Sequence, residues 1–205
     1  MALGDQLIDS NSFTIFRLFS GAITLSALLF VNQDFATLNK QSLNLVSLKR
    51  AGYLFLYAAF FSYAYILLDT ASGALILFTS VQFSMIAVQV FQQRTLALQE
   101  SCGLLLALLG FVFWMLPSSE SPSISGAILM MVSGMAWAAY TLAGKQSKNA
   151  KTDTAKNFMI AALLSLLLLP TYFIFISFNI TFLGLIYAIL SGALTSAIGY
   201  WVWYS

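Results

Sequence analysis

Residues 53–93 are YLFLYAAFFSYAYILLDTASGALILFTSVQFSMIAVQVFQQ, and this stretch decides the fold because it holds two apolar runs with almost no loop between them. The first run is Ala51–Leu68 and the second is Ala71–Phe91, with only Asp69 and Thr70 in between. Each run is close to the ~20 residues that a helix needs to cross the hydrocarbon core of a bilayer. So short a connection predicts two antiparallel membrane-spanning helices that pack along their length.

The composition places the whole chain in a membrane. Of its 205 residues, 60% are hydrophobic and only 8% are charged, whereas a soluble domain carries about 25% charged residues. We therefore expect an integral membrane protein whose main partner is the lipid bilayer. The net charge of +2 gives no argument for a nucleic-acid partner.

The absence of several reactive residues argues against an enzyme. The sequence has no histidine and a single cysteine, Cys102, which excludes an internal disulfide, a thiol metal cluster and a histidine-dependent hydrolase. It also contains no HExxH and no Walker A motif. We expect no enzymatic activity, no metal and no cofactor.

Seven apolar runs of spanning length predict an all-α polytopic membrane protein. The runs are Phe13–Val31, Ala51–Leu68, Ala71–Phe91, Leu98–Leu116, Ile124–Gly144, Phe158–Phe178 and Phe182–Tyr204. The shorter alternating strands of an outer-membrane barrel are absent.

The basic residues predict how these runs are threaded. Eight of the nine Lys and Arg residues lie in Asn32–Arg50, Gln92–Ala97 and Lys145–Asn157, which share one side if every run spans the membrane. The connections on the opposite side contain no basic residue. Because basic loops stay in the cytoplasm, we expect the N-terminus outside and the C-terminus inside.

The segment Pro117–Ser123 divides the chain, because its prolines and serines disfavour a continuous helix. The two parts show a weak internal similarity. Ser62–Tyr65 in the second run resembles Gly199–Val202 in the seventh. The charge rule gives these two runs opposite directions, and repeats of opposite orientation are typical of secondary transporters.

Four segments together carry a resemblance to a known family. They are Phe16–Ala22 with its Phe-Arg and Gly-Ala pairs, Tyr63–Ile76 with its tight turn, Gly134–Thr141 ahead of the lysine-rich loop, and Gly192–Trp201. In their order and loop character they resemble the EamA-type transporters of the drug/metabolite transporter (DMT) superfamily.

The resemblance implies ten helices in two inverted five-helix repeats in a bacterial cytoplasmic (inner) membrane. The seven runs then correspond to the second to eighth helices, so we expect a partial chain. Residues 1–117 would be a first repeat without its first helix, 118–123 an outer linker, and 124–205 a second repeat without its last two helices.

The function implied is secondary transport, by alternating access, of a small-molecule substrate such as an amino acid or a drug-like metabolite. The alternative is a non-transporting helical membrane protein, or an inactive fragment that acts as an assembly partner. A homodimer is one alternative for the assembly, because the sequence does not determine the oligomeric state.

Six residues are candidates for lining a substrate cavity: Arg17, Gln82, Gln89, Trp137, Tyr140 and Tyr200. Arg17 is the only basic residue inside a predicted span, about one turn below its outer end. Two interpretations of it stay open, namely snorkelling to the outer head groups and contact with an anion in the cavity. Gln82 lies near the middle of its run, where we expect a buried amide that faces the cavity.

Other polar residues favour structural roles. Asp69 is expected to cap the following helix rather than to carry a proton, and the serines of the fifth and seventh runs are expected to pack between helices. Trp201, Trp203 and Tyr204 are expected to form an inner aromatic belt. Pro170 should kink its helix.

Overall fold

The computed structural model describes residues 2–32, 44–92, 98–115, 123–145, 147, 149–173 and 178–204. Joined end to end where they are contiguous, the helical segments of these residues form seven helices. They are α1 (Ser10–Val31), α3 (Leu45–Leu67), α4 (Thr70–Phe91), α5 (Leu98–Met115), α6 (Ile124–Gly144), α7 (Ala150–Ser165) continued by η1 (Leu166–Phe173), and α8 (Phe182–Leu190) continued by η2 (Ser191–Ile198) and α9 (Gly199–Trp203). The predicted all-helical class is confirmed, while Lys40, Arg94, Lys148 and most of the 118–123 linker lie outside the described residues.

The helix that was predicted as Phe158–Phe178 begins two turns earlier, at Ala150. The side chain of Asn149 accepts a hydrogen bond from the Thr152 N–H at 3.2 Å, which is the usual way to begin a helix. Much of the predicted lysine-rich loop is therefore helical. At the other end the α-helix stops at Ser165 and continues as the 3₁₀ segment η1 around Pro170, whose ring removes a backbone donor and disturbs the helix as expected.

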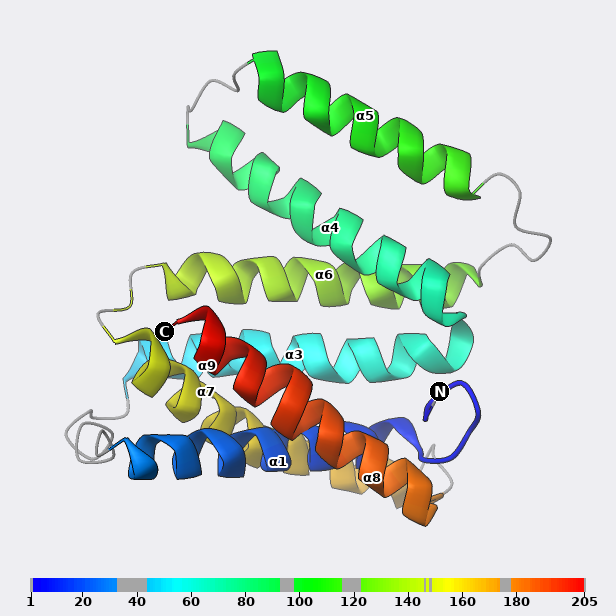
Figure 1. The fold of residues 1–205 in the computed structure, drawn as a ribbon. Helices are drawn as coiled ribbons and strands as arrows, with labels where there is room; N and C mark the ends of the chain where they lie inside the picture. Colours follow the sequence, from blue (N-terminus) through cyan, green and yellow to red (C-terminus); the bar gives the residue numbers. More distant parts are fainter. Residues whose placement is uncertain are drawn as a thin grey trace.

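Consecutive helices run in alternating directions, and the two termini lie at opposite ends of the bundle (Figure 1). Lys49 and Arg50 near the start of α3, Lys145 after α6 and Lys151 in α7 lie toward the end that holds the C-terminus. Asp69, between α3 and α4, lies at the other end. These basic residues thus gather at one end of the bundle, as the sequence predicted for the connections.

The prediction that α3 and α4 pack along their length is wrong. The two helices diverge after their turn, and α6 packs against both of them (Figure 1). Adjacent small residues of α6 make this possible. A Cβ atom on Gly134 would lie 2.6 Å from Ser80 Cβ of α4, so the helices meet there only because the position is glycine. On the α3 side, Ser133 Oγ donates to the Tyr57 carbonyl at 2.9 Å, which is the packing role expected of this serine.

Helix α1 lies against α7, α3, α8 and η2, and contributes Leu18, Leu25 and Leu29 to the buried core. Its closest approach is to η2. A Cβ atom on Gly192 would lie inside van der Waals contact with the Arg17 carbonyl and the Ser20 hydroxyl. This crossing fixes the backbone of α1 at Arg17.

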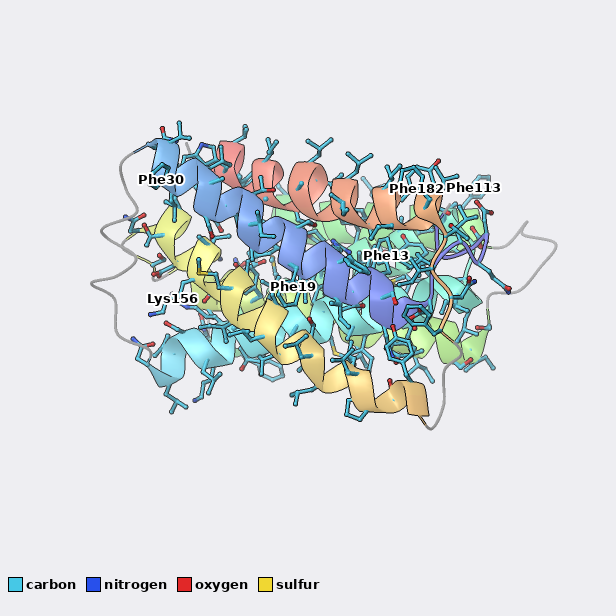
Figure 2. All side chains as sticks on the ribbon, turned by 90° about the horizontal axis from the view of Figure 1, so that it is seen from below. Phe13, Phe19, Phe30, Phe113, Lys156 and Phe182 are labelled. Carbon is cyan, nitrogen blue, oxygen red and sulfur yellow. The ribbon has the colours of Figure 1, made fainter. Side chains whose placement is uncertain are left out.

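Five helical stretches of the described chain are long and apolar enough to cross a membrane: Ser10–Val31, Thr70–Phe91, Ile124–Gly144, Ala150–Tyr172 and Phe182–Trp203. Large apolar side chains cover the perimeter of the bundle. Phe30, Phe113 and Phe182 are 72%, 79% and 80% exposed and lie at its edges (Figure 2). So much exposed apolar surface fits lipid and not water.

Candidate functional site

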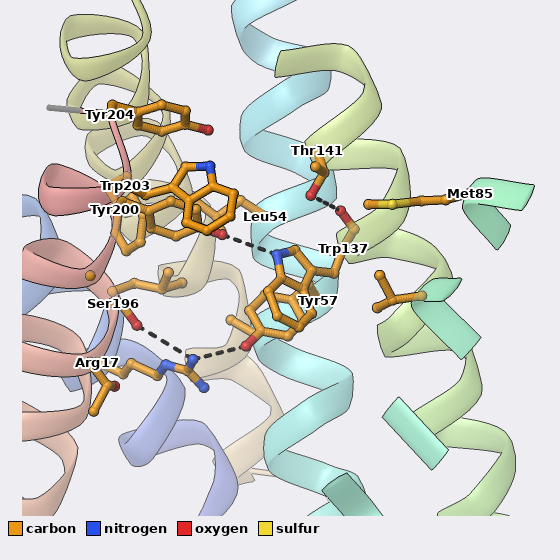
Figure 3. Close-up of a pocket in the computed structure, with 16 residues that line it drawn as sticks. Arg17, Leu54, Tyr57, Met85, Trp137, Thr141, Ser196, Tyr200, Trp203 and Tyr204 are labelled. Atoms are coloured by element: carbon orange, nitrogen blue, oxygen red, sulfur yellow. Dashed lines mark hydrogen bonds between the residues drawn. The ribbon is translucent and has the colours of Figure 1, made fainter. Parts of the chain in front are cut away.

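A cavity of about 490 Å³ lies between α1, α3, α4, α6, α7 and the last helix (Figure 3). Its size falls in the range of small-molecule sites. One of its described lining residues, Arg17, is charged. Six others are aromatic: Tyr57, Trp137, Phe158, Tyr200, Trp203 and Tyr204.

Arg17 lies deeper than the sequence indicated. The Asp9 carboxylate accepts from the Ser12 N–H at 2.9 Å and begins α1 at Ser10, which places Arg17 about 10 Å along the helix at 1.5 Å per residue. The side chain is only 8% exposed. It points into the bundle toward Tyr57 (Figure 3) and does not extend to the surface of the bundle.

The guanidinium group of Arg17 is held between hydroxyls and aromatic rings. Its Nη2 donates to Tyr57 Oη at 3.0 Å and lies 3.5 Å from Ser196 Oγ of η2. Its carbon lies 4.7 Å from the centre of the Phe61 ring and 5.4 Å from that of Tyr57. These contacts with the negative ring faces stabilise the cation and orient it.

No described residue beside Arg17 neutralises its positive charge. None of the described residues that line the cavity is acidic, and Arg17 Nη1 is buried without a hydrogen-bond partner in the described structure. A buried charge normally has an ion partner or a full set of hydrogen bonds. The site therefore combines one unpaired cation with an aromatic wall.

The aromatic wall is continuous from Arg17 to the C-terminal end of the bundle. The rings of Tyr57 and Trp137 stack with centroids 5.4 Å apart, and Trp137 Nε1 donates to Tyr200 Oη at 3.1 Å. Tyr200 in turn stacks on Tyr204 with centroids 6.2 Å apart. Stacking and the indole hydrogen bond fix these rings in place.

At the opposite end the bundle is tied by a polar network. The carboxylate of Asp9 accepts from Tyr172 Oη at 2.8 Å and from the Asn179 N–H at 3.3 Å. Ile8 and Ile180 form an isolated antiparallel bridge beside it. The network joins α1 to η1 and to the segment before α8.

A partly buried ion pair ties α3 to α7 near the C-terminal end. Arg50 Nη1 lies 2.8 Å from Asp153 Oδ2, which also accepts from Ser147 Oγ at 2.7 Å. Tyr140 and Tyr204 line a small recess beside this pair.

The six predicted site residues fall into three groups. Arg17, Trp137 and Tyr200 line the cavity, while Tyr140 is buried behind it and lines the recess at the ion pair. Gln82 and Gln89 do not line either space. The expected burial of Gln82 is corrected, because α4 turns Val81 and Met85 toward the cavity and leaves Gln82 exposed.

Several lining residues were missed or given another role. Tyr57 was not singled out, because nothing in the sequence tells which tyrosine of α3 faces inward. Ser196 was assigned to packing, and Trp203 and Tyr204 to an aromatic belt, yet all three line the cavity. A tryptophan or tyrosine near a helix end gives the same sequence signal in either role.

Asp69 has the capping role that the sequence predicted. Its carboxylate accepts from the backbone N–H groups of Ala71 and Ser72, each at 3.0 Å. Hydrogen bonds from Ser72 lower the pKa of Asp69. Among the described residues, no three His, Cys, Asp or Glu side chains gather to form a metal site.

These helices and this cavity define a helical membrane protein with a ligand-sized space inside its bundle. The chain belongs to the same family as the uncharacterized protein PA1977 of Pseudomonas aeruginosa. The two are 42% identical over 204 residues, which are 100% of this chain and 69% of that relative. No protein-family model and no solved structure matches the chain.

Proposed function

We propose that the protein is a secondary transporter of small organic metabolites, of the EamA type in the DMT superfamily, which acts by alternating access. The observation that carries the proposal is the cavity. It lies among apolar helices, has the volume of a small-molecule site and has one charged side chain in its described lining, Arg17, about a third of the way along α1. A charged residue inside a membrane span, facing other helices, is characteristic of a substrate pathway.

The pairing of helices supports two inverted repeats. Helix α1 packs on α8 and η2, and α7 packs on α3. In two matching repeats, α1 would correspond to α7, and α3 would correspond to the last helix. The contact of α1 with the last helix then has the contact of α7 with α3 as its counterpart. The corresponding helices run in opposite directions (Figure 1), which is the arrangement of inverted-repeat transporters.

The two ends of the bundle differ in a way that suits alternating access. The Asp9–Tyr172 network ties the N-terminal end, whereas the cavity reaches Trp203 and Tyr204 toward the other end. With the basic end in the cytoplasm of a bacterial cell, this arrangement would present the cavity to the inside. Exposure to the outside would then require the Asp9–Tyr172 network to open.

Transport is tested in proteoliposomes by counterflow of a panel of radiolabelled amino acids and aromatic acids, amines and alcohols. PA1977 is reconstituted in parallel. Thr195→Trp places a large ring in the cavity from an exposed lining position, and Ile128→Trp is the matched control on the exposed face of α6. We expect saturable flux of at least one solute, lost in Thr195→Trp and kept in Ile128→Trp.

Flux equal to that of protein-free liposomes for the whole panel, with folded protein, would contradict the proposal. It would favour a non-transporting membrane protein or an assembly partner. Flux that is equal in the two tryptophan variants would separate transport from this cavity.

A further inference from the structure

We infer that the cavity binds a small organic anion, with its carboxylate, phosphonate or sulfonate group on Arg17 and its apolar body against the aromatic wall. The inference names the substrate class of the proposed transporter, and it rests on that function because only a transporter exposes this cavity to solutes on both sides of the membrane.

The charge balance of the site favours a negatively charged ligand. Arg17 is more than nine-tenths buried, and among the described residues its Nη1 has no hydrogen-bond partner and no residue that lines the cavity is acidic. A structural arginine in apolar surroundings would be expected to have a carboxylate beside it, as Arg50 has in Asp153. An anionic ligand supplies the charge that the chain leaves out.

The hydroxyl groups around Arg17 are placed to add hydrogen bonds to an anion. The hydroxyls of Tyr57 and Ser196 lie 3.0 and 3.5 Å from Arg17 Nη2, where their oxygens accept. A hydroxyl is also a donor and rotates to suit its partner. When an anion takes the place of these oxygens at the guanidinium, the Tyr57 hydroxyl can donate to it, and the Ser196 hydroxyl can do so on leaving the Ser191 carbonyl, to which it donates at 3.1 Å. Three sets of donors then meet one anionic group, and such charge-assisted hydrogen bonds are the strong ones.

The lining of the remaining cavity favours an apolar body on the ligand. Beyond Arg17 the wall consists of the stacked pair Tyr57–Trp137 and of Tyr200, Trp203 and Tyr204. Flat rings of this kind favour an aromatic or aliphatic body over a strongly hydrated one. A cationic body could contact the same ring faces, but the positive charge of Arg17 would oppose it.

Tryptophan fluorescence provides a binding assay without a gradient, because Trp137 and Trp203 line the cavity. The protein in lipid nanodiscs is titrated with benzoate and phenylphosphonate, and with benzyl alcohol and benzylamine as neutral and cationic analogues. We expect saturable binding of the two anions. Binding of benzylamine as tight as that of benzoate overturns the inference.

Substitutions assign the binding to Arg17. Arg17→Gln should weaken benzoate binding by about tenfold or more, since it removes a charge-assisted contact, and Arg17→Lys should recover part of the loss. Lys49→Gln removes the same charge from an exposed position on α3 and should change nothing. Benzoate binding that is equal in wild type and in folded Arg17→Gln overturns the inference. If Arg17→Gln does not fold, the comparison of Arg17→Lys with Lys49→Gln decides, because lysine keeps the charge but loses the planar donor set.

Failure of the inference differs from failure of the proposed function. Arg17-dependent benzoate binding without flux of any solute overturns transport and leaves the anion site standing. Flux of neutral or cationic solutes that Arg17→Gln does not change overturns the anion site and leaves transport standing.

Discussion

Gly192→Ala tests whether the crossing of α1 and η2 positions Arg17. The added methyl group would lie inside van der Waals contact with the Arg17 carbonyl and the Ser20 hydroxyl. The hydroxyl can rotate away, but the carbonyl belongs to the backbone of α1 and can move only with the helix. Overpacking of this kind costs about 1–3 kcal/mol, and we expect about 3 kcal/mol because the obstacle is backbone.

Gly52→Ala is the matched control, because outside its own stretch of helix backbone no heavy atom of the described structure lies within 4 Å of a Cβ atom built there. Alanine is a better helix former than glycine by about 0.8–1 kcal/mol, so this variant should be unchanged or slightly more stable. The assay is unfolding in mixed micelles with increasing SDS, followed by circular dichroism. A separate titration with benzoate reports on Arg17.

We expect Gly192→Ala to lower the free energy of unfolding by about 3 kcal/mol and to weaken benzoate binding, while Gly52→Ala does neither. A Gly192→Ala protein as stable as Gly52→Ala would refute the close crossing. A destabilised variant with unchanged benzoate binding would show that the crossing does not position Arg17.

Three further outcomes follow from the described contacts. Asp153→Asn should cost about 3 kcal/mol in the same SDS assay, because it leaves Arg50 as a buried unpaired charge; a loss below about 1 kcal/mol would contradict the ion pair. Asp69→Asn should be slightly less stable than wild type at neutral pH, whereas Asp69→Ala should cost about 1 kcal/mol. Because the pKa of Asp69 is lowered, its extra contribution over asparagine is present above the unfolded-state pKa and is lost as the pH falls through the folded-state value; a difference that grows as the pH falls would be against this. In a Cys102→Ser background, Asp5→Cys and Lys49→Cys should react with an impermeant thiol reagent from opposite sides of inverted and right-side-out vesicles, and reaction from one side would undo the threading.

In the described part of the chain, the order of the seven long helices could be predicted, because hydropathy marks the segments that lipid surrounds. Their ends could not always be predicted, because a helix continues past the apolar run as far as its cap. Asn44 and Asn149 cap α3 and α7 through hydrogen bonds to Ser47 and Thr152. Both helices therefore include polar residues that hydropathy assigned to loops. Helix α6, with Ser123 as its cap, has the predicted bounds.

The candidate site was predictable where charge singled out a residue and unpredictable where rotation about a helix axis decided. Arg17 stood out as a lone cation in an apolar run. Gln82 and Tyr57 lie on helices that are apolar nearly all round, so their sequence does not tell which face points inward. That face is set by α6, which lies between α3 and α4. The short turn between α3 and α4 does not indicate that another helix packs between them.

The distance in sequence between Arg17 and its contact on η2 has a consequence for biosynthesis. Ser196 follows Arg17 by 179 residues, and Gly192, which receives the Arg17 backbone, is almost as distant. The ribosome therefore delivers the arginine to the translocon long before η2 exists. Until then Arg17 can contact Tyr57 of α3 but not Ser196, so α1 reaches its final packing only after a helix that is synthesised much later has joined it.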